Sequence, residues 1–146
     1  MIWRTRYLRN SAWESEAALK EQVLLFAVED KGIRNDIRNM LATLKIQVKY
    51  VERPQYNRTL ASLAGLQPMK DLPLPYDGPE FDMPLLIFTG IEDRKLSLVI
   101  DALKKYEKCT FPLKAVMTET SKNWAAAYAY IHIKAEHESL HPEAGR

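Results

Sequence analysis

The stretch PLLIFTGIEDRKLSLVIDALKKY, residues 84–106, decides the fold expected for this chain. Its first part, PLLIFTG, is short, apolar and followed at once by charge, which is typical of a buried strand. Its second part places Leu96 and Ile100 at the spacing of one helix face. A strand followed by an amphipathic helix opens a βαβ unit, so the stretch predicts an α/β protein.

The same order of residues occurs earlier in the chain. QVLLFAV, residues 22–28, reads as a buried strand, and residues 29–45 carry an apolar helical stripe that Asp30 is expected to cap. Aligned on these blocks, Phe26 matches Phe88, Ile33 and Ile37 match Leu96 and Ile100, Lys49 matches Lys114, and Asn57 matches Asn123. An internal repeat at this spacing predicts two copies of a strand–helix–strand–helix unit.

We expect the two βαβα units to share one four-stranded sheet. Each pair of strands should be parallel with a right-handed crossover, and two strands alone are marginal. The simplest solution is one pseudo-twofold α/β domain, ferredoxin-like or related, with helices on the sheet and an extra N-terminal arm. The expected divisions are an arm at 1–20, units at 21–66 and 84–138, a linker at 67–83 and a flexible tail at 139–146.

The linker, QPMKDLPLPYDGPEFDM, is rich in proline and carries a net charge of −3. Proline fixes φ and donates no amide hydrogen, so we expect an extended segment. Two arrangements remain open. The acidic linker lies across one of the more basic units, or it is a solvated spacer.

The arm contains WRTRYLR, residues 3–9, in which Trp3, Thr5 and Tyr7 alternate with Arg4, Arg6 and Leu8. A strand would place the aromatic rings on one face and the arginines on the other. Such an arm would dock on the domain or on a partner chain, although arginines between aromatics are also typical of segments that grip single-stranded nucleic acid.

Composition indicates an ordinary globular chain. The 146 residues are 47% hydrophobic and 27% charged, and the net charge of +2 does not indicate nucleic-acid binding. The single cysteine, Cys109, excludes an internal disulfide. Without a secretory signal or a long apolar run, we expect a cytoplasmic protein that does not bind membranes.

HESLH, residues 137–141, matches the zinc-peptidase signature, yet the sequence argues against a metal site. His137 and His141 would supply two ligands, but only PEAGR follows, so no third ligand can come from further along the chain. We expect the last helix to span residues 122–138 and to bury a stripe through Trp124, Ala127, Tyr128, Ile131 and Ala135. No metal, cofactor or catalytic residue is predicted.

Open α/β sheets bind ligands beyond the carboxyl ends of their strands. The loops expected there are VEDK, TGIED and MTETSKN, and they supply the candidate ligand-binding residues Asp93, Thr118, Thr120, Ser121 and Asn123. Hydroxyls beside a helix N-terminus can hold an anion such as phosphate, but the same residues are ordinary helix caps.

The second unit resembles a bacterial family known as domain of unknown function 3783. The resemblance covers residues 83–137 and rests on the LLIFTG strand and turn, the helix after Glu92 and Asp93, PLKAVMTET, and Asn123 with Trp124. It supports the α/β fold and implies no activity. After Trp124 the family tends to carry a Leu- and Glu-rich helix, whereas this chain reads AAAYAYIHI.

We therefore predict a small non-enzymatic module that works through protein contacts, as a regulatory domain or as a homodimer. The residues expected on its contact surface are apolar groups outside the predicted stripes, namely Trp3, Tyr7, Tyr130 and Ile133. The alternatives are a small-molecule or anion sensor that uses the strand-end loops, and an RNA-associated module that uses the arm and the helix lysines.

Overall fold

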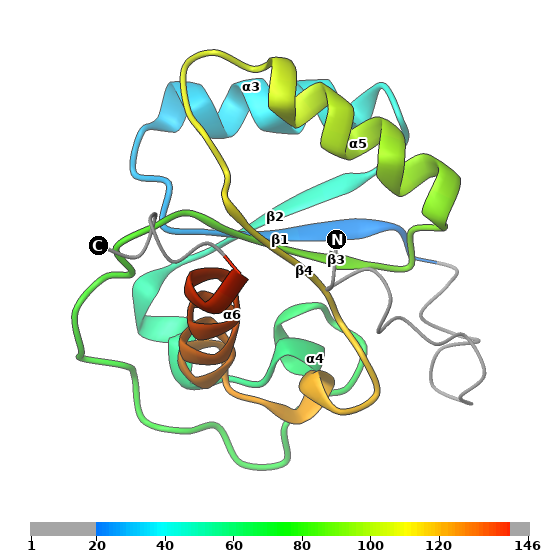
Figure 1. Ribbon diagram of the computed structural model, residues 1–146. Coiled ribbons are helices and arrows are strands. Elements are labelled where there is room, and N and C mark those ends of the chain that lie inside the picture. Colours follow the sequence, from blue (N-terminus) through cyan, green and yellow to red (C-terminus); the bar gives the residue numbers. More distant parts are fainter. Residues whose placement is uncertain (1–19, 141–146) are drawn as a thin grey trace.

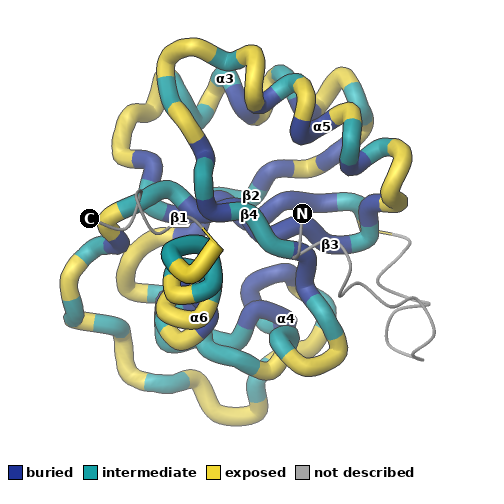
Figure 2. The backbone as a smooth tube through the Cα atoms, viewed as in Figure 1, coloured by how far each residue is buried: buried dark blue, intermediate teal, exposed yellow. Residues whose placement is uncertain are grey.

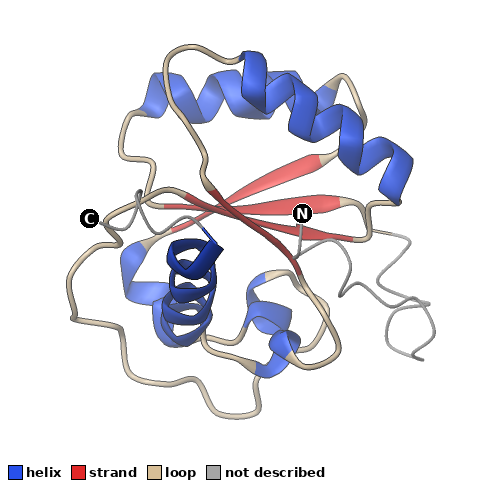
Figure 3. Ribbon diagram, in the orientation of Figure 1, coloured by secondary structure: helices blue, strands red, loops and turns tan. Residues whose placement is uncertain are grey.

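The computed structural model describes residues 20–140, which form an open four-stranded sheet between two layers of helices (Figures 1 and 3). The elements run in the order β1 (Gln22–Phe26), α3 (Lys31–Ala42), β2 (Gln47–Val51), η1 (Arg53–Asn57), α4 (Leu60–Leu63), β3 (Leu85–Thr89), α5 (Asp93–Lys105), β4 (Leu113–Val116), η2 (Ser121–Asn123) and α6 (Ala126–Leu140). The predicted mixed α/β fold with one four-stranded sheet is confirmed. None of the helices in this part of the chain is long and apolar enough to cross a membrane.

The sheet has the strand order β2-β1-β3-β4. β1 and β2 are parallel, β3 and β4 are parallel, and the central strands β1 and β3 are antiparallel, with Leu24 opposite Ile87 and Leu25 opposite Leu86. In a ferredoxin-like split βαβ unit another strand separates the two parallel strands. Here β1 and β2 are direct neighbours, so the ferredoxin-like detail is not confirmed.

Each face of the sheet is covered by helices from both halves of the chain. α3 and α5 pack on one face, against Val23 and Leu25 of β1, and α6 and the shorter α4 pack on the other, against Leu24 and Phe26. The alternation follows from the pleat, which turns successive side chains to opposite faces. Figure 2 shows the result as a buried sheet between helices whose outer surfaces are exposed.

The structure corrects the alignment of the two halves by one residue. Phe26 packs on the α4/α6 face, whereas Phe88 packs on the α3/α5 face. The expected pseudo-twofold relation, which stays a prediction, would map each face of the sheet onto itself, so it would not pair Phe26 with Phe88. Phe26 corresponds to Thr89, and a one-residue slip in a strand reverses every side chain. The next residues, Ala27 and Gly90, then coincide and share a positive φ of 62° and 70°.

The second strands show the same one-residue correction. Lys49 donates its Nζ proton to the carbonyl of Leu63 on the α4 side, while Lys114 borders the opposite face, so the counterpart of Lys49 is Ala115. After these strands, Glu52 and Gln55 make a capping box, and Thr118 and Ser121 make the equivalent reciprocal pair of bonds.

The halves also exchange two backbone hydrogen bonds below the sheet. Leu60 N donates to Trp124 O at 2.9 Å, and Ala126 N donates to Arg58 O at 3.0 Å. These reciprocal contacts support the repeat hypothesis, while the origin of the halves by duplication stays a prediction.

The linker is extended and lies against the first unit and α6. Its backbone is held by Tyr76 N, which donates to Pro54 O, and by Leu74 O, which accepts from Asn57 Nδ2. The Phe81 ring lies between Tyr56 and Tyr130, with ring centres 4.1 and 3.9 Å away. At the tip of the linker Leu72 and Leu74 are 63% and 84% exposed.

Candidate functional site

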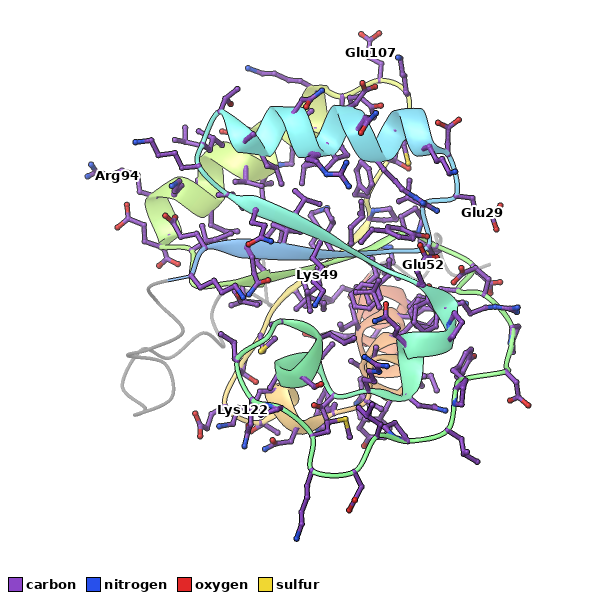
Figure 4. All side chains as sticks on the ribbon, turned by 180° about the vertical axis from the view of Figure 1, so that it is seen from behind. Glu29, Lys49, Glu52, Arg94, Glu107 and Lys122 are labelled. Atoms are coloured by element: carbon purple, nitrogen blue, oxygen red, sulfur yellow. The ribbon has the colours of Figure 1, made fainter. Side chains whose placement is uncertain are left out.

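The residues predicted to bind a ligand do not form one site. Asp93 lies in the first turn of α5, on the α3/α5 face of the sheet. Thr118, Thr120, Ser121 and Asn123 lie in and before η2, which leads to α6 on the opposite face (Figure 1). The side chains of Glu29 and Arg94, which flank the two strand–helix turns, point away from the body of the molecule in Figure 4.

The hydroxyls of Thr118 and Ser121 are used to close a turn. Thr118 N donates to Ser121 Oγ at 2.9 Å, and Ser121 N donates to Thr118 Oγ1 at 3.0 Å, while the two hydroxyls lie 3.1 Å apart. Thr120 and Asn123 are exposed beside this turn. The arrangement is a capping motif that satisfies its own amides, which leaves little for an anion to bind.

The predicted contact residues fall in two places. Trp3 and Tyr7 lie outside the described residues. Tyr130 and Ile133 belong to the inner side of α6, where the Tyr130 ring is 7% exposed because Phe81 stacks on it and Ile133 packs against the core. The structure therefore places Tyr130 in the interior.

The register predicted for the last helix is wrong by two positions. Ala126, Ala129 and Tyr130 are its buried residues, whereas Tyr128 and Ile131, predicted to be buried, are 49% and 64% exposed. The Trp124, Tyr128 and His132 rings form an outward cluster, with centres 4.4 to 5.2 Å apart. The outer face of α6 is therefore aromatic and apolar.

Next to α6, strand β4 presents an edge of the sheet. Within residues 20–140, β4 has a strand neighbour on one side, β3. Met117 N donates to Phe88 O at 3.0 Å, so alternate residues 113, 115 and 117 turn their amides toward β3. The amides and carbonyls of Lys114 and Val116 consequently face away from the sheet. We call this pair of residues the β4 edge.

A pocket borders the β4 edge on each face of the sheet. The α6-side pocket has a volume of about 110 Å³ and is lined by Ala115, Met117, Trp124, His132, Ile133 and Glu136, among others. The α5-side pocket has a volume of about 270 Å³ and is lined by Ile100, Leu103, Lys104, Cys109, Phe111 and Lys114, among others. Side chains that alternate across an added strand would enter the two pockets in turn.

The two pockets differ in charge. Lys104 and Lys114 line the α5-side pocket, where the Lys114 ammonium donates to the Phe111 carbonyl. Burial, followed by the charge of Lys104, lowers the pKa of Lys114 below its ordinary value. Burial also raises the pKa of the Cys109 thiol in this pocket, so the thiol stays protonated at neutral pH. The α6-side pocket is lined by the acidic residue Glu136 instead.

The β4 edge was not anticipated from the sequence. The strand–helix–strand–helix pattern expected for the second unit includes a second strand, but which strand lies at the border of a sheet depends on strand order. A hint was present in Pro112, because proline is found at the borders of sheets and at strand ends.

HESLH is described only in part. His137 lies in the last turn of α6, and His141 lies beyond the described residues. Between residues 20 and 140 the fold brings together no group of three His, Cys, Asp or Glu side chains placed to hold a metal ion.

No curated protein and no solved structure matches this chain. A match does exist among protein families, and it agrees with the resemblance seen in the sequence. It covers β3 through α6, together with the β4 edge. Residues 84–140 thus match the family described as a domain of unknown function, DUF3783.

Proposed function

We propose that this chain is a non-enzymatic protein-interaction module that binds an extended segment of a partner as a fifth strand on the β4 edge. The observation that carries the proposal is the β4 edge with a pocket on each side. Backbone groups that face outward from a sheet edge bind a strand of any sequence, and pockets for alternate side chains provide selectivity.

The charges of the pockets define the chemistry of the partner segment. On the α5 side, Lys104 and Lys114 favour aromatic side chains, since a cation over an aromatic ring is attractive. On the α6 side, Glu136 favours Arg or Lys. A segment that alternates aromatic and basic residues therefore fits the edge on both faces.

The length of β4 favours a short segment over a second copy of the domain. Four residues at about 3.3 Å each give roughly 13 Å of edge. A stable interface between two folded domains covers about 800 Å² on each partner, which is more than such an edge supplies.

The two alternative functions have less support. The hydroxyls predicted to bind an anion hold each other, as described above. For RNA binding, the Arg34 side chain of α3 is not available, because its guanidinium lies 3.6 Å from the centre of the Tyr50 ring and donates to Val28 O. These contacts leave fewer polar and charged groups available for binding an anion or RNA.

The proposal is tested by titrating the full ¹⁵N-labelled chain, carrying Trp3→Ser and Tyr7→Ser, with a peptide of four Tyr-Arg repeats, followed by NMR. The two substitutions remove the aromatic rings of the chain's own alternating segment, which would otherwise compete with the peptide. The control peptide has the same composition in two blocks, four tyrosines and then four arginines. We expect the alternating peptide to shift the amide signals of Lys114 and Val116 and to bind about tenfold more tightly than the block peptide.

Two variants locate the binding. Lys114→Pro removes an outward N–H without removing a bond to β3, whereas Lys114→Thr removes the same ammonium group and keeps the N–H. Binding should weaken further, by about tenfold, in the proline variant than in the threonine variant, because one edge hydrogen bond is lost. Equal affinities of the two variants, or no shift at Lys114 and Val116, would show that the β4 edge is not the binding site.

A further inference from the structure

A segment of the kind expected to bind the β4 edge, with alternating aromatic and basic residues, occurs in this chain itself. We propose that residues 3–8, WRTRYL, of the same chain bind along the β4 edge and are its resident fifth strand. This inference rests on the proposed function, since it names the segment that the edge takes. It assigns the Trp3 and Tyr7 side chains to one pocket and the Arg4 and Arg6 side chains to the other.

Alternation fixes which face each side chain meets. In an extended segment Trp3, Thr5 and Tyr7 share one face, and Arg4 and Arg6 share the other. The aromatic residues match the larger α5-side pocket, about 270 Å³, where Lys104 and Lys114 offer cations. The arginines then meet the α6 side and the carboxyl group of Glu136. The opposite placement would bring arginines against lysines, so charge selects one orientation.

The chain is long enough to make this connection. Lys20, the first described residue, is held by a hydrogen bond from its Nζ to Ala64 O, just before β1 begins. Gln22 lies opposite Thr89, the last residue of β3, so β1 begins at the end of the sheet where β3 and β4 finish. A position beside β4 is about three strand spacings from β1, roughly 14 Å. Residues 9–19 span up to about 36 Å when extended, so they reach it easily.

The strand would also protect two specific amides. The N–H groups of Lys114 and Val116 face away from β3, so a strand at that position is what would shield them from solvent. Their hydrogen exchange therefore reports on the fifth strand directly and is independent of the identity of any outside partner.

The test is hydrogen exchange of the full chain, read by NMR at Lys114 and Val116. We expect both amides to exchange at least about tenfold more slowly in the natural chain than in the double variant Trp3→Ser, Tyr7→Ser. Trp13→Ser is the matched control, since it removes a tryptophan from the connecting segment and should leave both rates unchanged. Exchange at Leu24 and Ile87, in the centre of the sheet, should stay slow in every variant and shows that the fold is intact.

Two results would overturn the inference. One is fast exchange of Lys114 and Val116 in the natural chain, and the other is protection that survives the double variant or appears only at high protein concentration. Failure of the proposed function is a separate outcome, because the Tyr-Arg peptide is titrated onto the double variant. If that peptide binds while the natural chain shows no protection, only the residues 3–8 inference fails. If the natural chain is protected but the double variant binds no peptide, the proposed binding of an outside partner fails.

Discussion

The buried Thr89 side chain differs sharply from the residue at the corresponding position of the first half. Its counterpart, Phe26, packs against Tyr56 and Phe81 in an aromatic cluster. Thr89 is 2% exposed, and its hydroxyl has no hydrogen-bond partner among the described residues. A buried hydroxyl without a partner keeps the cost of its lost hydration, so this position reduces the stability of the fold.

Thr89→Val should therefore raise the free energy of unfolding, by about 1 kcal/mol, because it replaces the hydroxyl with a methyl group of similar shape. Urea denaturation measures the change. Thr59→Val is the matched control, since the Thr59 hydroxyl accepts from Ser62 N and caps α4. That variant should lose about 1 kcal/mol. A loss of stability in Thr89→Val as well would mean that the Thr89 hydroxyl has a stabilising partner after all.

Asp36 links α3 to the loop after α5. Tyr106 Oη donates to Asp36 Oδ2 at 2.7 Å, and Lys108 lies 3.4 Å from the same oxygen. The tyrosine bond and the lysine charge hold the pKa of the Asp36 carboxyl below its ordinary value, while burial and the bond to Asp36 raise the pKa of Tyr106 to about 12. Since the folded-state pKa of Asp36 is lowered, its contribution to stability is present above the ordinary pKa and is lost as pH falls through the folded-state pKa.

Tyr106→Phe removes the larger of the two stabilising contacts. We expect the pKa of Asp36 to rise toward its ordinary value, and we expect less stability to be lost on acidification below pH 4, as the ordinary value is 3.8. NMR titration of the Asp36 carboxyl carbon measures the pKa. An unchanged pKa would show that Lys108 alone accounts for the shift.

Among the elements, α6 shows why the buried face of a helix sometimes cannot be predicted from the sequence. Its first eight residues, AAYAYIHI, are apolar or aromatic on every side, so the sequence does not say which face is buried. The capped helix α3 and the strands were predictable, because polar residues marked their limits or one of their faces. In α6 the buried face is determined by contacts with Phe81 of the linker and with the α4/α6 face of the sheet. Both lie far from α6 in the sequence.

The corrected face of α6 can be checked with two substitutions. Tyr130→Ala should lower the free energy of unfolding by about 3 kcal/mol, because it empties the space below Phe81. Ile131→Ala, at the adjacent exposed position, should change it by less than about 0.5 kcal/mol. Thermal or urea unfolding of both variants distinguishes the two registers, since the original prediction requires the larger loss at Ile131.

Across the whole molecule, the antiparallel contact between β1 and β3 joins the halves. Paired strand–helix blocks were sufficient to predict a shared four-stranded sheet, because neither half buries its apolar strand alone. The order of the strands and the β4 edge could not be predicted, since pairing between β1 and β3 depends on contacts about 60 residues apart in the chain. The candidate site depends on that strand order, so most of it could not be predicted from the sequence either.

Residues 84–140 should not fold alone, although they match a family model by themselves. Without β1, the strand from Leu85 to Phe88, at most 1% exposed in the full chain, would lose one neighbour and much of its cover. Circular dichroism should show no cooperative melting for the 84–140 fragment and a single transition for residues 20–140. A cooperative transition in the short fragment would show that the second half is an independent domain.

The position of Phe81 between Tyr56 and Tyr130 has a consequence for how the chain tolerates change. The rings fix the path of the linker from Tyr76 to Phe81, whereas the tip around Leu72 and Leu74 projects into solvent. Insertions, epitope tags or a whole grafted domain are accommodated at that tip, because its ends stay anchored. The same additions after Tyr76 would displace the Phe81 ring from its position between Tyr56 and Tyr130.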